Sequence, residues 1–168
     1  MLRPLQNAGT QIATSIKNGG TLFWCGNGGS AADSKHLAAE LVGRFKKDRQ
    51  ALRSIALTTD TSVLTCVADD YTFEDVFSRQ LEASGRSGDL LVAISTSGNS
   101  DTVLRVLRAA KELSIKTIAL LGKDGGHANA LADRAIVIPS DSTARIQEAH
   151  ILIGHILCDL IEQELGLA

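Results

Sequence analysis

The sequence predicts an α/β protein with a three-layer αβα sandwich, in which helices cover both faces of a parallel central sheet. Five short apolar runs recur along the chain, and segments with helical periodicity lie between them. The apolar runs lack the polar alternation of half-exposed strands, which is typical of strands covered on both faces. Strands that alternate with helices are joined by right-handed crossovers, and these connections produce a doubly wound parallel sheet.

The expected elements follow in order from these patterns. The first run, TLFWC, is rich in strand-forming residues and ends at glycines, whereas the second run is weaker. The segment that begins at Ser100 has apolar residues at helical spacing, and Ser100 itself is a natural N-cap. We expect strands at residues 21–25, 54–57, 90–94, 116–121 and 135–138, and helices at residues 5–17, 30–42, 72–83, 100–113 and 144–165.

The composition indicates one ordinary domain over residues 1–168. Hydrophobic residues make up 44% of the chain, and no linker rich in glycine and serine divides it. Because 17 lysines and arginines nearly balance 19 aspartates and glutamates, we expect no nucleic-acid or membrane-surface partner. No long apolar run or signal-peptide centre is present. Three scattered cysteines are typical of a reducing compartment, so we expect a cytoplasmic protein.

Two strand-to-helix loops have features of phosphate-binding loops. CGNGGS at residues 25–30 and ISTSGNS at residues 94–100 each lead from an apolar strand into a helix. Ligands of open α/β sheets bind beyond the carboxyl ends of the strands, where helix N-termini offer free N–H groups. Glycine and serine also make ordinary turns and N-caps, but the second loop adds four hydroxyl groups. These belong to Ser95, Thr96, Ser97 and Ser100. Neither loop matches the Walker A motif or the dinucleotide fingerprint.

Two predicted helices carry polar side chains that suit a metal ion. His36 and Glu40 are four residues apart, so both project from one face of their helix. In the last helix, which is largely apolar, Gln147 and His155 are two turns apart, and we expect His155 to be buried and to need a bonding partner. Together these side chains make a ligand set suited to zinc. An exposed helix pair and a core histidine bonded to a backbone carbonyl are the alternative interpretations.

At these residues the sequence resembles the phosphoheptose isomerases (sedoheptulose 7-phosphate isomerases) of the sugar-isomerase (SIS) domain superfamily. The resemblance covers nearly the whole chain and rests on CGNGGS, DD before TFEDVFSRQ, ISTSGNS, GKDGG and RIQE with two following histidines. It implies a flavodoxin-like SIS fold and a homotetramer with active sites at subunit contacts. It also implies an aldose–ketose isomerase that converts D-sedoheptulose 7-phosphate to D-glycero-D-manno-heptose 7-phosphate through an enediol, with one zinc ion in each site.

The resemblance also assigns roles to individual residues. Glu40 and His155 are the expected catalytic acid–base residues. The expected zinc ligands are His36, Glu40, Gln147 and His155. The expected substrate-binding residues are Asn27, Gly28, Gly29, Glu40, Asp69, Asp70, Ser95, Thr96, Ser97, Ser100 and Gln147.

The chain departs from the family pattern in three places, and two other functions stay open. The N-terminal helix at residues 1–20 is expected to be shorter than usual, Ala39 replaces a glutamate of some members, and Asp69 replaces an asparagine. One alternative is a non-catalytic SIS-domain protein that binds the bacterial replication initiator, and the other is an SIS isomerase for another sugar phosphate. The non-catalytic relative lacks residues that match Glu40 and His155, so their presence favours an enzyme.

Overall fold

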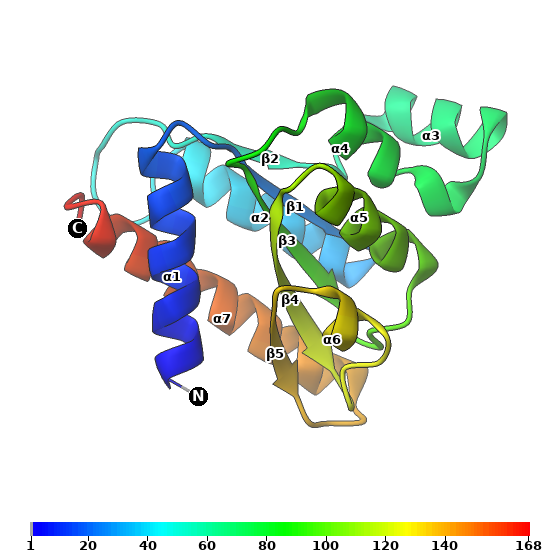
Figure 1. Cartoon of the computed structure of the whole chain (residues 1–168). Coiled ribbons are helices and arrows are strands. Elements are labelled where there is room, and N and C mark those ends of the chain that lie inside the picture. Colours follow the sequence, from blue (N-terminus) through cyan, green and yellow to red (C-terminus); the bar gives the residue numbers. More distant parts are fainter. Residues whose placement is uncertain (1) are drawn as a thin grey trace.

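Five apolar segments pair in parallel to form one sheet with the order β2–β1–β3–β4–β5 in the computed structural model, which describes residues 2–168 (Figure 1). The strands are β1 (Leu22–Gly26), β2 (Ser54–Ala56), β3 (Leu90–Ser95), β4 (Lys116–Gly122) and β5 (Arg134–Ile138). All five predicted strands are confirmed, with small differences at their ends. Every residue of β1 and β3 is buried, as expected for strands covered on both faces.

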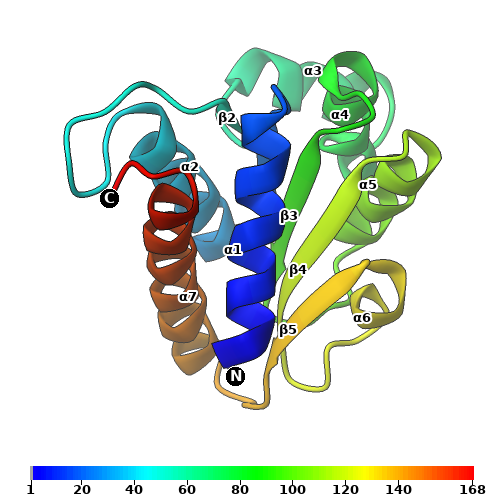
Figure 2. The ribbon, with the colours of Figure 1, turned by 60° about the vertical axis from the view of Figure 1, so that its left-hand side comes forward.

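Helices cover both faces of the sheet and give the predicted three-layer sandwich (Figure 2). One face carries α1 (Leu2–Lys17), α2 (Gly29–Val42) and α7 (Thr143–Glu164). The other carries α3 (Thr61–Asp70), α4 (Ser78–Ser84), α5 (Asp101–Glu112) and α6 (Ala128–Leu131). Because side chains of a strand alternate between faces, Trp24 packs with the first layer and Phe23 with the second. Among residues 2–168, no helix has both the length and the apolar character needed to cross a bilayer.

The region before β3 departs from the predicted pattern. The single helix expected at residues 72–83 is wrong, because a 3-10 turn (Phe73–Asp75) and the short α4 occupy this region after α3. The prediction also lacks α3, whose sequence contains several β-branched residues that favour helices weakly. Asp60 supports α3, since its Oδ1 accepts a hydrogen bond from the backbone N–H of Val63 at 3.0 Å.

The strand order places the two glycine loops side by side at the carboxyl edge of the sheet. β1 and β3 are parallel neighbours, with Gly26 opposite Ile94. The chain after β1 continues into α2 on one face, whereas the chain after β3 continues into α5 on the other. A reversal of this kind is where open α/β sheets bind their ligands.

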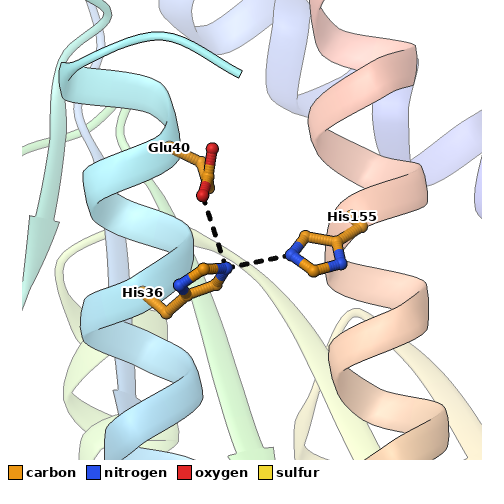
Figure 3. Close-up of side chains that lie close together, drawn as sticks. All are labelled: His36, Glu40 and His155. Carbon is orange, nitrogen blue, oxygen red and sulfur yellow. Dashed lines mark hydrogen bonds and ion pairs between the residues drawn. The ribbon is translucent and has the colours of Figure 1, made fainter. Parts of the chain in front are cut away.

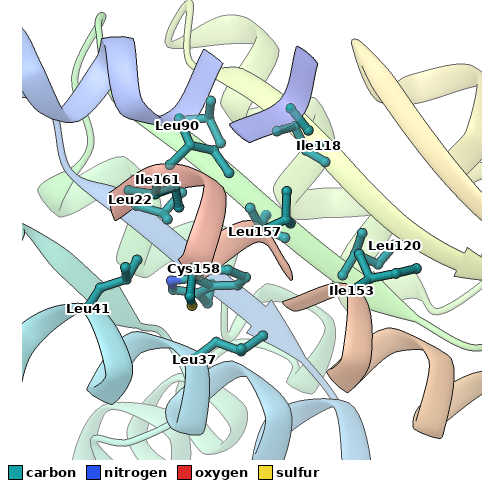
Figure 4. Close-up of a cluster of buried hydrophobic side chains, with 14 of the residues drawn as sticks. Leu22, Leu37, Leu41, Leu90, Ile118, Leu120, Ile153, Leu157, Cys158 and Ile161 are labelled. Carbon is teal, nitrogen blue, oxygen red and sulfur yellow. The ribbon is translucent and has the colours of Figure 1, made fainter. Parts of the chain in front are cut away.

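Close packing of α2 against α7 depends on a glycine. A Cβ atom at Gly154 of α7 would lie 2.4 Å from a methyl carbon of Leu37 on α2. Leu37 is completely buried in the core that also contains Leu41, Ile153 and Leu157, so its side chain has no free space to move into (Figure 4). The two helices therefore approach each other more closely than a larger residue would allow.

We expect Gly154→Val to lower the free energy of unfolding by about 1–3 kcal/mol, because the added carbons overlap Leu37 in a filled core. Urea unfolding followed by circular dichroism measures this change. Gly166→Asn is the control, because Gly166 has a φ of 70° and open space around it, and asparagine tolerates that conformation. Equal stability of Gly154→Val and the wild type would contradict the tight contact.

Candidate active site

The first glycine loop brings the start of α2 against β3. Gly28, with a φ of 56°, precedes Gly29, the first residue of α2. A Cβ atom at Gly26 would lie 2.7 Å from the Cβ of Ser30 and 2.8 Å from the carbonyl oxygen of Ile94. Only glycine fits this close approach, which explains the loop composition. The free N–H groups of the first turn of α2 therefore lie at the carboxyl edge of the sheet.

A pocket of about 140 Å³ lies between the two loops. Its lining residues are Asn27, Ser30, Ile94, Ser95, Thr96, Ser97 and Ser100. The structure therefore brings the four predicted hydroxyl residues together with Asn27. Ser30 was not predicted, although its place directly after the glycines is a signal that the sequence contains. Within the described chain this lining includes no lysine or arginine, so any attraction for an anion would come from hydroxyl groups and helix N-termini.

Asn27 links the two loops through its side-chain amide. Its Nδ2 donates to Ser100 Oγ at 2.8 Å and to Thr102 Oγ1 at 2.7 Å. Ser100 precedes α5 as predicted, but its hydroxyl makes no capping hydrogen bond to the helix. Within the second loop, Ser95 Oγ accepts a hydrogen bond from the N–H of Gly98 at 3.1 Å. These bonds hold the shape of the pocket without help from a ligand.

A second group of predicted residues forms a cluster between α2 and α7 (Figure 3). His36 Nε2 lies 2.9 Å from His155 Nε2 and 3.4 Å from Glu40 Oε1. His36 and Glu40 project from one face of α2, as their spacing predicts, and His155 comes from α7. The His36 side chain is 48% exposed and that of Glu40 is 24% exposed, so a ligand can reach both.

Two of the three ligand pairs in this cluster have spacings that suit a zinc ion. One ligand atom from each of His36, Glu40 and His155 lies within 4.8 Å of the others. Two ligands that each bind zinc at about 2.1 Å are at most about 4.2 Å apart, and both contacts of His36 meet this limit. Imidazole nitrogen and carboxylate oxygen are also donors that zinc accepts.

Gln147, the fourth predicted ligand, packs against the start of α2. A Cβ atom at Gly29 would lie 2.4 Å from Gln147 Nε2, so the amide packs against the first residue of α2. His36 is seven residues further along α2, which corresponds to about 10 Å of helix axis. The structure brings His36, Glu40 and His155 together and places the Gln147 amide beside the first glycine loop, and the role of Gln147 as a zinc ligand stays a prediction.

Asp69 and Asp70 lie outside the pocket. Both are exposed at the C-terminal end of α3, where the Cys66 thiol donates to Asp70 Oδ2 at 3.3 Å. Neither carboxylate is among the residues that line the pocket between the loops. Contact of these two residues with a substrate stays a prediction.

Two unpredicted residues lie beside the cluster. Asp33 precedes His36 by about one turn, and its Oδ2 is buried with no hydrogen-bond partner among residues 2–168. Burial raises the pKa of Asp33, while the nearby His36 and His155 work to lower it. Phe45, which follows α2, stacks on the His155 ring with 5.7 Å between centroids. Helical spacing is a sequence signal for Asp33, whereas no pattern indicates the Phe45 contact.

The two histidines of α7 differ in burial. His150 is completely buried, and its Nε2 donates to the carbonyl oxygen of Leu121 at 3.0 Å. His155 is only partly buried and faces His36. The expectation that His155 is the buried histidine is therefore wrong. The two residues are five positions apart, so they project from different sides of the helix, and His150 is the one that faces the sheet.

Comparison with known proteins identifies the family. A model of the SIS domain family matches residues 2–122. The phosphoheptose isomerase of Nitratiruptor sp. is 58% identical over 149 residues, which are 89% of this chain and 80% of that relative. The phosphoheptose isomerase of Aliarcobacter butzleri is 52% identical over 166 residues, which are 99% of this chain and 88% of the relative. The chain belongs to the phosphoheptose isomerase family.

A solved structure of this isomerase family shares the fold. The phosphoheptose isomerase from Neisseria gonorrhoeae matches with a TM-score of 0.91 and 46% sequence identity. The match covers 96% of this chain and 86% of that one. The predicted SIS fold and the predicted isomerase class are therefore confirmed.

We expect His150→Gln to reduce the loss of stability between roughly pH 7 and pH 5. Burial lowers the pKa of His150, and the bond to the Leu121 carbonyl only partly opposes this effect. Because the folded-state pKa lies below the unfolded value of about 6.5, His150 contributes stability above that value and loses it as the pH falls. Thermal melting at both pH values measures the difference. The glutamine amide can still donate to Leu121, so an unchanged pH dependence would contradict this role.

Proposed function

We propose that the protein is an aldose–ketose isomerase that converts D-sedoheptulose 7-phosphate to D-glycero-D-manno-heptose 7-phosphate through an enediol. The observation that carries the proposal is that one helix, α2, contributes both to a hydroxyl-lined pocket and to an acid–base cluster. The name phosphoheptose isomerase, carried by relatives at 58% and 52% identity, supports this choice of substrate.

The phosphate group of the sugar occupies the pocket between the two loops. Hydroxyl groups of Ser95, Thr96 and Ser97 donate to the phosphate oxygens, and the N-termini of α2 and α5 favour their negative charge. Gly28 and Gly29 carry no side chains, so the backbone there can approach the sugar closely.

The reaction moves one proton from C1 to C2 of the sugar and another from the oxygen on C1 to the oxygen on C2. Glu40 removes a proton from C1 of the ketose and later returns it to C2, which gives the aldose. His155 donates a proton to the oxygen on C2 and takes one from the hydroxyl group on C1, so the protons balance. His36, Glu40 and His155 would hold the zinc ion, which when bound would supply positive charge near the substrate oxygens.

We also propose a homotetramer with its sites at subunit contacts. Leu152 and Ile156 lie one turn apart on α7 and are 60% and 36% exposed on either side of His155 in the sequence. Exposed apolar side chains beside a site favour a surface that another chain covers. Assembly would also allow Asp69 and Asp70 to contribute to a neighbouring site. Cytoplasmic location and the lack of nucleic-acid and membrane partners stay predictions from composition.

We expect the protein to isomerise sedoheptulose 7-phosphate with a requirement for zinc, and Glu40→Gln to reduce turnover by roughly 10²–10⁴-fold. Product formation is followed by NMR, and the zinc content of each protein is measured in parallel. Activity lost with zinc retained assigns proton transfer to Glu40, whereas loss of both shows that Glu40 holds zinc and does not separate this role from proton transfer. Glu82→Gln, at an exposed carboxylate on α4, is the control.

Three outcomes of this experiment would change the proposed function. No turnover by the zinc-loaded wild-type oligomer contradicts an isomerase of this substrate. Turnover of a different sugar phosphate would keep the reaction and change the substrate. Binding to the bacterial replication initiator without any turnover would favour the non-catalytic alternative.

We expect Thr96→Val to raise KM for the sugar phosphate by roughly 10–100-fold with a smaller change in kcat. Valine keeps the shape of threonine but lacks the hydroxyl donor, and a hydrogen bond to a charged group contributes about 1.5–3 kcal/mol. Steady-state kinetics measure both constants. Thr65→Val is the matched control, because the Thr65 hydroxyl bonds to a carbonyl of its own helix outside the pocket. An unchanged KM in Thr96→Val would place the phosphate elsewhere.

A further inference from the structure

The α2–β2 loop, residues 43–53, lies along α7, the helix that carries His155 (Figure 2). Phe45 stacks on the His155 ring with an angle of 23° between the ring planes. Lys46 Nζ pairs with Asp159 Oδ1 at 2.7 Å, four residues further along α7. The loop therefore attaches to the face of α7 that presents His155.

Arg49 makes the most buried of these attachments. Its Nε donates to Glu162 Oε1 at 2.9 Å, and the two side chains are only 2% and 0% exposed. Glu162 lies seven residues after His155, so the ion pair continues the same face of α7.

The same guanidinium group also holds the C-terminal end of α2. Its Nη atoms donate to the backbone carbonyls of Glu40 at 2.8 Å, Leu41 at 2.9 Å and Gly43 at 2.8 Å. Carbonyl groups in the last turn of a helix have no partner within the helix, so Arg49 supplies a donor for the Glu40 carbonyl, whereas the Leu41 carbonyl also accepts from the backbone N–H of Leu52 at 3.0 Å. One of these groups belongs to Glu40. Arg49 therefore connects Glu40 directly to the helix that carries His155.

Stability alone is a weak explanation for this arrangement. The free-energy cost of removing two charges from water offsets much of their mutual attraction. Apolar side chains of similar volume often stabilise a core equally well. A planar guanidinium, in contrast, holds several acceptors in one fixed geometry. The Arg49–Glu162 pair is therefore better suited to setting the position of the groups attached to it.

We propose that Arg49 and Glu162 are positioning residues that hold Glu40 in place relative to His155, and that Phe45 holds the plane of the His155 ring. The inference rests on the proposed function, in which Glu40 and His155 act on the same substrate. None of the three added residues lines the pocket between the glycine loops. Partners that orient metal ligands commonly change metal affinity or activity by about 10–100-fold when they are replaced.

The first test replaces the guanidinium and keeps its charge. We expect Arg49→Lys to weaken zinc binding by roughly 10–100-fold, measured by competition with a chromophoric chelator, and to alter the visible spectrum of Co²⁺ bound in its place. We expect kcat to fall by a similar factor while KM stays within about twofold, because the pocket between the glycine loops is unchanged.

Asp89→Asn is the matched control for Arg49→Lys. Like Arg49, Asp89 is a buried charged side chain in a hydrogen-bond network, and it accepts from the backbone N–H groups of Thr21 and Arg86 at the opposite edge of the sheet. We expect this control to lose stability while it keeps the zinc affinity and the Co²⁺ spectrum of the wild type. Equal losses of zinc affinity in both variants would show that general destabilisation is the cause, and would overturn the proposal.

A double variant separates positioning from folding. Arg49→Met combined with Glu162→Leu removes both charges and leaves neither partner buried alone, so we expect a folded protein. Reduced zinc affinity in this folded protein supports the proposal, whereas wild-type zinc affinity and an unchanged Co²⁺ spectrum overturn it. Phe45→Leu is expected to shift the Co²⁺ spectrum, and no shift would remove Phe45 from the proposal. Failure of the proposed function would show separately, as absent turnover in the wild type.

Discussion

The contact between α2 and α7 is the constraint on which the rest of the site depends. Gly154 lets Leu37 pack directly against α7, and the two helices then cross the same face of the sheet side by side (Figure 4). At this separation the imidazoles of His36 and His155 approach to 2.9 Å. Because a closely packed core cannot adjust continuously, one buried apolar contact sets the geometry of a polar, partly exposed cluster.

The helix α2 links the pocket between the glycine loops to the cluster of His36, Glu40 and His155, and its length sets the distance between them. Ser30, in the first turn, lines the pocket between the loops, whereas His36 belongs to the cluster. The interval of six positions from Ser30 to His36 corresponds to about 9 Å of helix axis. The proposed substrate also has two separate ends, because the phosphate of a heptose 7-phosphate lies at one end of the carbon chain and the reacting carbons, C1 and C2, lie at the other. One helix can therefore hold the first end and act on the second.

Charge is distributed unevenly across this region. The pocket is lined by hydroxyl and amide groups with one isoleucine, and the cluster contains His36 and Glu40, whose side chains are 48% and 24% exposed. Behind the cluster, the Arg49–Glu162 pair is almost completely buried. The planar guanidinium of Arg49 holds Glu162 Oε1 and the carbonyls at the end of α2 in one fixed geometry, while Glu162 Oε2 has no hydrogen-bond partner among residues 2–168. The fold thus places the Arg49–Glu162 pair in the interior and the His36 and Glu40 side chains nearer the surface.

The sequence by itself determined the layers, the strands and the pair on α2, because these depend on local properties. Apolar runs without polar alternation predict covered strands, and an interval of four residues puts His36 and Glu40 on one face of any helix. The split of the helix expected at residues 72–83, the burial of His150 and the position of Gln147 were decided only by the tertiary structure. The Arg49–Glu162 pair joins residues more than a hundred positions apart. Contacts between distant segments leave no periodic signal in the chain, so only the packed molecule reveals them.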